Sequence, residues 1–192
     1  MRLFIALPLP ENTREALDRI TGRLRPLGGK VKWVATGNIH ITVRFLGETD
    51  EDRIDDLKQM VNRIASSFAA TDTIIDRLGG FPNLKRPRVI WAGLAEDKAV
   101  ERLGQLAHQI ELAVRTLRFE PEKKGFNPHI TLGRVREPRG LDELLQTIRE
   151  YRVEPIPLRL DRLVLFKSTL TSRGPVYEPL HEARLGQERL GG

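Results

Sequence analysis

The sequence predicts an α+β fold in which two similar lobes, each a mainly antiparallel sheet with outer helices, surround a central cleft. Apolar residues alternate along the chain between the spacing of strands and the spacing of amphipathic helices. Both halves share this layout, and each carries the tripeptide His-Ile-Thr within a strand pattern, at His40 and at His129. No linker or low-complexity stretch divides the chain, so we expect a single domain over residues 1–192.

The first half predicts a strand, a helix, two strands and a second helix. The predicted elements are strands at 2–7, 30–34 and 38–46 and helices at 12–24 and 49–68. Asn12 or Thr13 is a suitable N-cap for the first helix, because their side-chain oxygens accept hydrogen bonds from free backbone N–H groups. The second helix begins with acidic residues, which favour a helix N-terminus.

The second half repeats this order with one more strand at its end. The predicted elements are strands at 72–78 and 88–94 around a Gly-Gly-Phe-Pro-Asn turn, a helix through 100–117, a strand at 127–135, a short helix at 141–150, one long strand at 155–168 and a last short strand at 174–180 before a polar tail. Apolar residues recur at helical spacing in both predicted helices.

Composition excludes several kinds of chemistry. The chain has no cysteine, so disulfides, thiolate nucleophiles and cysteine-ligated zinc are ruled out. No run of about 18 apolar residues is present, and the apolar start is too short for a signal peptide. We therefore expect a cytoplasmic protein with no membrane partner. Lys and Arg number 32 against 26 Asp and Glu, and this excess weakly favours a polyanionic partner.

The two His-Ile-Thr strands each place an imidazole beside a hydroxyl. Successive side chains of a strand point to opposite faces, so His40 and Thr42 share one face, as do His129 and Thr131. The same alternation adds Arg44 to the His40 face. The opposite, apolar face is predicted to consist of Ile39, Ile41, Val43 and Phe45. If an approximate twofold axis relates the lobes, the two His-x-Thr faces meet across the cleft.

Two facing imidazoles suit the cleavage of a phosphodiester. A neutral imidazole takes a proton from the attacking oxygen while a protonated one gives a proton to the leaving oxygen. Hydroxyl and guanidinium groups hold the other phosphate oxygens. Because the ordinary histidine pKa lies near 6.5, both protonation states are accessible at neutral pH. This chemistry needs no cofactor, and four histidines without nearby carboxylates at ligand spacing disfavour a metal site.

The two motifs and their surroundings resemble a known family. The stretches HITVRFLG and HITLGR are similar to the paired His-x-Thr signatures of the 2H phosphoesterase superfamily, in particular its RNA 2′,3′-cyclic phosphodiesterase branch, also called 2′-5′ RNA ligase. The resemblance extends to RLFIALPLP, GGFPN with RVIWAGL, FNPHITLGRV and LVLFKSTLTSRGPVYEPL. It implies the bilobal 2H phosphoesterase-like fold and metal-independent hydrolysis of RNA 2′,3′-cyclic phosphate ends to 2′-phosphomonoesters.

The resemblance also implies roles for single residues. His129 activates the nucleophile and His40 protonates the leaving oxygen, although the near-symmetry of the motifs allows the reverse. Thr42 and Thr131 hydrogen-bond the phosphate. Members of the family also join tRNA halves reversibly through a 2′-5′ linkage, which is the same chemistry with a ribose hydroxyl in place of water. The implied partner is RNA with a cyclic phosphate end, for example a tRNA fragment, and we expect a monomer.

Two arginines are candidates for substrate binding. Arg44 shares the His40 face by alternation. Arg134 matches an arginine of the family that follows the second motif, but alternation points it away from His129 unless Gly133 allows a bulge or strand end that turns it back. The four aromatic residues that could stack on a nucleobase are better explained by core packing; they are Phe4, Trp33, Trp91 and Tyr177.

Two other functions remain open from the sequence. The His-x-Thr strands could recognise a terminal phosphate in an RNA-binding module without turnover, which leaves the second imidazole without a clear purpose. The chain could also hydrolyse another phosphate ester, such as a small cyclic nucleotide. Tests of turnover and a small panel of substrates separate these alternatives from hydrolysis of RNA ends.

Overall fold

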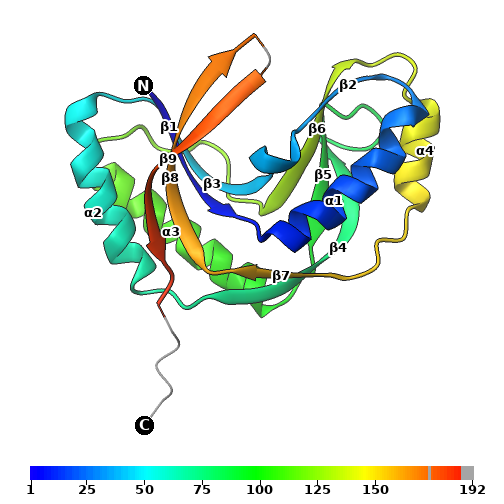
Figure 1. The fold of residues 1–192 in the computed structure, drawn as a ribbon. Helices are drawn as coiled ribbons and strands as arrows, with labels where there is room; N and C mark the ends of the chain where they lie inside the picture. The colour runs from blue at the N-terminus through cyan, green and yellow to red at the C-terminus, as the bar shows by residue number, and fades with distance from the viewer. Residues whose placement is uncertain (173, 187–192) are drawn as a thin grey trace.

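The computed structural model describes residues 1–172 and 174–186 and shows two antiparallel sheets (Figure 1). One sheet has the strand order β3-β1-β8-β9 and the other β2-β6-β5-β4-β7. The strands are β1 (Arg2–Pro8), β2 (Lys30–Trp33), β3 (His40–Glu48), β4 (Thr71–Phe81), β5 (Val89–Leu94), β6 (His129–Glu137), β7 (Ile156–Leu160), β8 (Arg162–Thr171) and β9 (Gly174–Arg184). The helices are α1 (Glu11–Leu24), α2 (Ile54–Ala65), α3 (Lys98–Thr116) and α4 (Asp142–Glu150). The predicted α+β class with two lobes is confirmed.

The lobes are not the two halves of the sequence. The strand that follows α2, β4, pairs with β5 in the second sheet, while β8, from the second half, pairs with β1 in the first. The order β3-β1-β8 in one sheet therefore corresponds to the order β6-β5-β4 in the other. In each sheet the third of these strands comes from the other half of the chain. Strand β2 also crosses over, because it pairs with β6. Each lobe thus contains segments from both halves of the chain.

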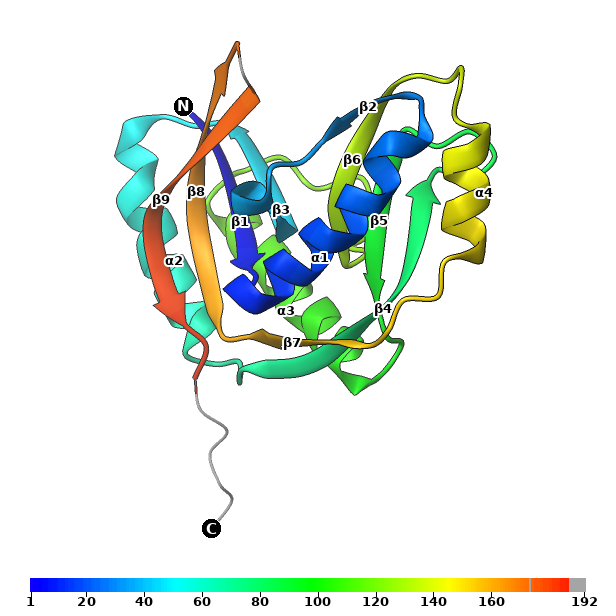
Figure 2. The same ribbon diagram turned by 45° about the vertical axis from the view of Figure 1, so that its right-hand side comes forward.

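Helices cover the outer sides of the sheets (Figure 2). Helix α2 packs on β8 and β9, whereas α1 and α4 contact strands of the second sheet. The Thr13 hydroxyl donates a hydrogen bond to the Pro157 carbonyl oxygen in β7 at 3.1 Å, which ties α1 to that sheet. Thr13 is therefore not an N-cap. The helix begins at Glu11 after Pro10 and has no side-chain cap.

Several predicted boundaries differ from the structure, and three elements are affected in particular. The long strand predicted at 155–168 is two strands, and Asp161 separates β7 in one sheet from β8 in the other. The second predicted helix starts later, because residues 51–53 form a 3₁₀ turn before α2. The last strand is longer than predicted, since β9 runs to Arg184. Part of the predicted polar tail lies outside the described residues.

Both His-x-Thr strands contain a bulge at the same place. In β3, Ala6 of β1 faces Thr42 and Ile5 faces Arg44, so Val43 is an extra residue. In β6, Trp91 of β5 faces Thr131 and Ile90 faces Gly133, so Leu132 is extra. A bulge shifts the alternation of side chains by one position. The residue three after each threonine, and not the residue two after it, therefore shares the threonine's face.

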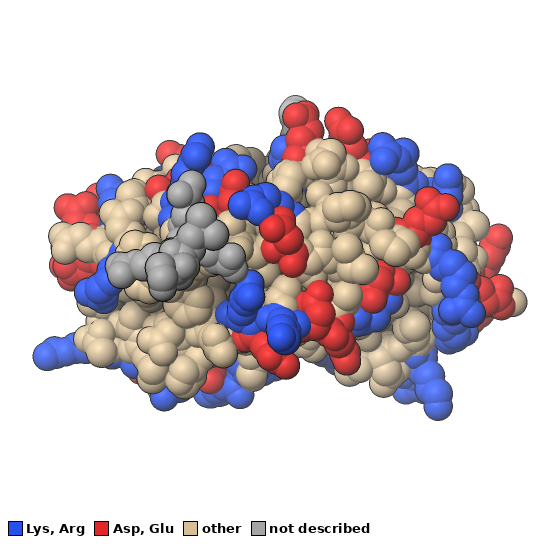
Figure 3. Space-filling model, turned by 90° about the horizontal axis from the view of Figure 1, so that it is seen from below, with Lys and Arg blue, Asp and Glu red and all other residues tan. Residues whose placement is uncertain are grey.

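The underside of the molecule shows no concentration of one charge. Seen from below, basic and acidic side chains lie beside one another (Figure 3). Arg159 pairs with Asp72 at 2.6 Å and Arg162 with Glu182 at 3.3 Å. Such exposed pairs contribute little stability.

Among the described residues, no helix is both long enough and apolar enough to cross a membrane.

Candidate active site

A cleft between the two sheets brings both His-x-Thr motifs together. This central cleft has a volume of about 630 Å³ and receives side chains from β1, β2, β3, β6, β8 and β9. The predicted site residues that line it are His40, Thr42, His129, Thr131 and Arg134. The faces of the two motifs therefore meet, as the repeat predicted.

His40 lies deep in the cleft as a neutral imidazole. Its Nδ1 is 2.8 Å from the Asn38 carbonyl oxygen, which only accepts hydrogen bonds, so Nδ1 carries the proton. Its Nε2 is 2.9 Å from the Thr42 hydroxyl and accepts a hydrogen bond from it. The Phe4 ring lies 5.0 Å away, and the Tyr177 ring packs edge-on at 5.3 Å. Desolvation by this burial lowers the pKa of His40 to about 4, with the charges of Arg134 and His129 adding to the effect.

His129 is held in the same way. Its Nδ1 donates to the Asn127 carbonyl oxygen at 2.7 Å, which leaves Nε2 as the free basic atom. Phe81 packs edge-on against the imidazole at 4.8 Å. Desolvation lowers the pKa of His129 below its ordinary value, and Arg134 lowers it further. Each motif therefore fixes one tautomer and presents an unprotonated Nε2.

The residue that orients each ring was not predicted from the sequence. Both motifs begin with an asparagine two residues before the histidine, Asn38 and Asn127, and the backbone carbonyl of each binds Nδ1. The recurrence of Asn-x-His-x-Thr in both halves was a visible signal. In both copies this pattern places the asparagine carbonyl oxygen next to Nδ1, and the resulting hydrogen bond determines which ring nitrogen carries the proton.

Positive charge gathers in the central cleft. Four cationic side chains line it, Arg2, Lys32, Arg134 and Arg136, and no carboxylate is among its described lining residues. Arg134 reaches the cleft because of the β6 bulge at Leu132. At Gly133, the next residue, a Cβ atom would come within 2.7 Å of Val31 Cγ1. The absence of a side chain lets β2 approach β6 closely. This arrangement attracts an anion, because a cleft lined by one sign of charge focuses the field.

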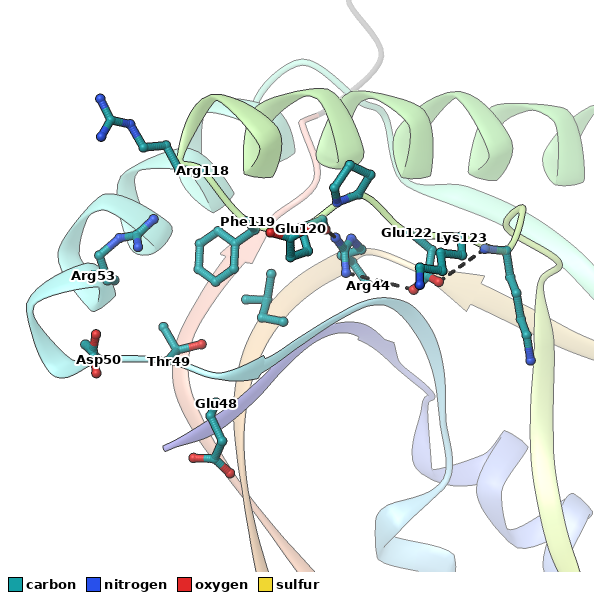
Figure 4. Close-up of a pocket in the computed structure, with 13 residues that line it drawn as sticks. Arg44, Glu48, Thr49, Asp50, Arg53, Arg118, Phe119, Glu120, Glu122 and Lys123 are labelled. Carbon is teal, nitrogen blue, oxygen red and sulfur yellow. Dashed lines mark hydrogen bonds and ion pairs between the residues drawn. The ribbon is translucent and has the colours of Figure 1, made fainter.

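Arg44 does not reach the cleft, which corrects the prediction from alternation. The β3 bulge turns its side chain to the opposite face, where it is only 8% exposed. Its Nε lies 2.6 Å from Glu111 of α3, and its other nitrogens bond the carbonyl oxygens of Phe45 and Glu120. Figure 4 shows Arg44 beside Glu120 and Glu122, and the Glu122 carboxylate lies 3.9 Å from the guanidinium. Arg44 therefore links β3 to α3 and to the segment that follows it.

Phe45 takes the place in the cleft that was predicted for Arg44. It is 56% exposed and lines the central cleft at the position that Arg134 occupies in the other motif. Alignment of HITVRF with HITLGR pairs these two residues, so the repeat itself carried the signal. Of the other aromatic candidates, Phe4, Trp33 and Tyr177 line the cleft. Trp91 instead lies over Gly79 in the second sheet.

The remaining histidines lie outside the central cleft. His181 bonds the Asn62 side-chain oxygen at 2.7 Å, and His108 is exposed on α3.

The fold and the two opposed imidazoles define the class of the protein: it is a phosphoesterase of the two-histidine type.

Comparison with known proteins agrees with this class. The model of the LigT-like phosphoesterase family matches residues 7–91 and 94–177, and each segment contains one His-x-Thr motif. The chain belongs to this family.

Relatives and solved structures match almost the whole chain. The RNA 2′,3′-cyclic phosphodiesterase of Methanocaldococcus jannaschii is 34% identical over 95% of this chain and 99% of its own length. The enzyme of the same description from Thermotoga maritima is 32% identical, over 96% of this chain and 95% of its own. A crystal structure of a Thermus thermophilus protein is 31% identical, with a TM-score of 0.79 over 98% of this chain and 100% of that one. Escherichia coli LigT in complex with 3′-AMP is 25% identical, with a TM-score of 0.75 over 97% and 98% of the two chains.

Proposed function

We propose that the protein hydrolyses RNA 2′,3′-cyclic phosphate ends to 2′-phosphomonoesters by paired-histidine catalysis. The observation that carries the proposal is the pair of imidazoles in one cationic cleft, each with Nδ1–H held by a carbonyl and Nε2 left for catalysis. Relatives over 30% identical along nearly the whole chain are described as RNA 2′,3′-cyclic phosphodiesterases, which supports this substrate.

The phosphate is proposed to lie between the two motifs. The hydroxyls of Thr42 and Thr131 donate to its non-bridging oxygens, and the Arg134 guanidinium balances its charge. In the free protein the Thr42 hydroxyl bonds His40, so the substrate exchanges that hydrogen bond for one to phosphate. Threonine is suited to this task, because its branched side chain has few rotamers in a strand.

Proton transfer is assigned to the two Nε2 atoms. His129 takes the proton of the attacking water, and His40 gives a proton to the leaving 3′ oxygen. Burial keeps both rings neutral in the free protein, because it lowers both pKa values. The bound phosphate anion raises the pKa of each imidazole, so that His40 carries a proton in the complex.

The test is turnover of an oligoribonucleotide that ends in a 2′,3′-cyclic phosphate, measured with EDTA present. We expect a 2′-phosphate product from the wild type. His40→Ala and His129→Ala each lower kcat by about 10²-fold or more, the contribution typical of a general acid or base. His181→Ala is the matched control, because that histidine lies outside the cleft.

Other outcomes would select a different function. Binding of the oligonucleotide without turnover by the folded wild type would favour a module that recognises RNA ends. Turnover of a small cyclic nucleotide but not of the oligonucleotide would favour a different ester. Loss of activity with EDTA would contradict the metal-independent mechanism.

A further inference from the structure

The outer part of the central cleft has two unlike walls. Lys32 of β2 and Arg136 of β6 are exposed on one side, and Leu170 of β8 and Val176 of β9 are exposed on the other. These four residues are called the cleft mouth below. The end of the β8–β9 hairpin projects at the same end of the molecule as β2 in both views (Figure 1, Figure 2). The mouth therefore has a cationic wall from one sheet and an apolar wall from the other.

The cationic wall brings like charges together. Lys32 lies directly opposite Arg134 in the β2–β6 ladder, and Arg136 follows Arg134 by two residues. Like charges that face each other across a ladder destabilise a sheet. The next charged pair of the same ladder is complementary, since Lys30 bonds Glu137 at 2.6 Å. In the described part of the chain neither Lys32 nor Arg136 has an ion pair, so a bound anion would offset their repulsion.

A single terminal phosphate does not account for the whole cationic wall. Under the proposed function, that phosphate lies between Thr42 and Thr131, and Arg134 balances its charge. Arg136 lies roughly 7 Å further from the motif along an extended strand. RNA carries one phosphate per nucleotide, so a chain that ends at the motif has its next phosphate one nucleotide away on the 5′ side. The cationic wall therefore suits a chain with a second phosphate.

The apolar wall exposes side chains that are usually buried. Leu170 is 65% exposed and Val176 is 54% exposed. Of the four large hydrophobic residues that are exposed in the described chain, three line the central cleft; the four are Phe45, Leu112, Leu170 and Val176. Exposed apolar side chains that lie together mark interaction sites. A base that packs on this wall would remove apolar surface from water.

The hairpin that forms the apolar wall is held close to the cationic wall. The Asn38 side-chain amide donates a hydrogen bond to the Pro175 carbonyl oxygen at 2.9 Å. A Cβ atom placed on Gly174 would lie 3.5 Å from Lys32 Nζ, so this lysine reaches from β2 toward the start of β9. One strand of RNA can place its phosphates against one wall and its bases against the other, as in other grooves for single-stranded nucleic acid.

We propose that the cleft mouth binds the nucleotide on the 5′ side of the cyclic phosphate end; the inference rests on the proposed function. The phosphate that links this nucleotide to the terminal one lies on Lys32 and Arg136, and its base packs against Leu170 and Val176. A single-stranded oligoribonucleotide is then a better substrate than a mononucleotide, which fills only part of the site. Aliphatic side chains contact any base, so the subsite recognises the length of the strand and not its sequence.

Two substrates that differ by one nucleotide test the subsite. Uridylyl-adenosine 2′,3′-cyclic phosphate has the linking phosphate and the preceding base, whereas adenosine 2′,3′-cyclic phosphate lacks both. The readout is kcat/KM for formation of the 2′-phosphate, expressed as the ratio of the dinucleotide to the mononucleotide. We expect a ratio of about ten or more for the wild type, because hydrogen bonds to charged groups contribute about tenfold or more in affinity.

Substitutions on the cationic wall are expected to lower this ratio. Lys32→Ala and Arg136→Ala should each reduce it about fivefold, because a contact to the linking phosphate is lost. Lys30→Ala is the matched control, since Lys30 is an exposed lysine of the same strand, pairs with Glu137 and does not line the central cleft. It is expected to leave the ratio unchanged.

The apolar wall has a matched pair of its own. Leu170→Ala is expected to lower the ratio about threefold, because less apolar surface is buried by the preceding base. Leu112→Ala removes an exposed leucine of α3 that does not line the central cleft, and it should leave the ratio unchanged. Equal ratios in these two variants would contradict a base contact at the hairpin.

A dinucleotide with an uncharged methylphosphonate link isolates the phosphate contact. This link should lower the wild-type ratio about fivefold and have little effect in the double variant Lys32→Ala, Arg136→Ala, because the charge and its partners act as one interaction. A wild type that hydrolyses both cyclic phosphates with equal kcat/KM would overturn the inference and leave the proposed function intact. Equal losses on both substrates in Lys32→Ala would also overturn it. Turnover of neither substrate would overturn the proposed function and the subsite together.

Discussion

The imidazole of His40 is neutral in the folded protein because aromatic rings exclude water from it. Its pKa of about 4 lies below the ordinary value of 6.5 that the unfolded chain has. The unfolded state therefore binds more protons than the folded state between these two values. The neutral ring contributes stability that is fully present above pH 6.5 and is lost as the pH falls toward 4.

The pH dependence of unfolding tests this burial. Between pH 7 and pH 5 we expect the wild type to lose about 2 kcal/mol more stability than His40→Gln, from a pKa lowered to about 4. Urea unfolding at the two pH values measures the difference. His181→Gln serves as the control, and an equal loss in the wild type and His40→Gln would show that His40 is not buried as a neutral group.

The rate profile should differ between the free and bound states. Both imidazoles have lowered pKa values in the free protein, and the phosphate anion raises them in the complex. Because kcat/KM reports the free enzyme and kcat the complex, we expect the optimum of kcat/KM at a lower pH than that of kcat. Steady-state kinetics on the cyclic phosphate from pH 4.5 to 8.5 would show this; coincident optima would contradict it.

The histidines and threonines of the site could be predicted from the sequence, but their neighbours could not be predicted equally well. Period-two alternation holds from His40 to Thr42 and fails at the next residue, because Val43 is an extra residue in the ladder. Nothing in the letters Val-Arg-Phe marks a bulge. Gly133 gave such a hint in the second copy, and Arg134 was accordingly expected to turn back into the cleft.

At the scale of elements, Arg44 fastens β3 to α3 and to the segment before β6. The Arg44 guanidinium and the Glu111 carboxylate are both largely buried. Burial alone would raise the pKa of Glu111. The pKa is nevertheless lowered, because Arg115, the Glu122 backbone N–H and Arg44 all donate hydrogen bonds to the carboxylate. Removal of one member of a buried pair leaves the other without its partner. The bulge that turns Arg44 away from the cleft therefore places its side chain where it joins β3 to α3.

Arg44→Ala is expected to destabilise the protein by about 3 kcal/mol, as for other broken buried pairs. Arg159→Ala removes an exposed pair with Asp72 and should cost less than about 1 kcal/mol. Urea unfolding at pH 7 compares the two variants. Similar free energies of unfolding for both would mean that the Arg44 contacts add no stability.

Element boundaries were predicted best where periodicity was long and uninterrupted. The helix at 98–116 matched its apolar spacing, and Asp97 caps it by accepting hydrogen bonds from the N–H groups of Ala99 and Val100. The stretch at 155–168 was predicted as one strand because it has strand composition throughout. Its division at Asp161 follows from which sheet each part joins, and that is a long-range property that local patterns do not contain.

At the scale of the whole molecule, the exchange of β4 and β8 makes each lobe depend on both halves of the chain. A cut between residues 94 and 95 follows β5 and divides the chain close to the boundary between the two segments that match the family model. The fragment 1–94 then lacks β6 beside β5 and β8 beside β1. We expect neither fragment alone to unfold cooperatively, as measured by circular dichroism during a urea titration. A sharp transition in either one would contradict a single domain over 1–192.

The single residue between β7 and β8 also limits how the two lobes move. Asp161 alone joins a strand of one sheet to a strand of the other, and its carbonyl oxygen accepts a hydrogen bond from the Leu185 N–H at 2.8 Å. Hinge motion requires several residues whose backbone angles change freely. This crossing has no such slack, so the chain path restricts relative movement of the two sheets at this point. Under the proposed function, an RNA end enters the cleft between these two sheets, and we expect a single-stranded end to be hydrolysed faster than the end of a duplex.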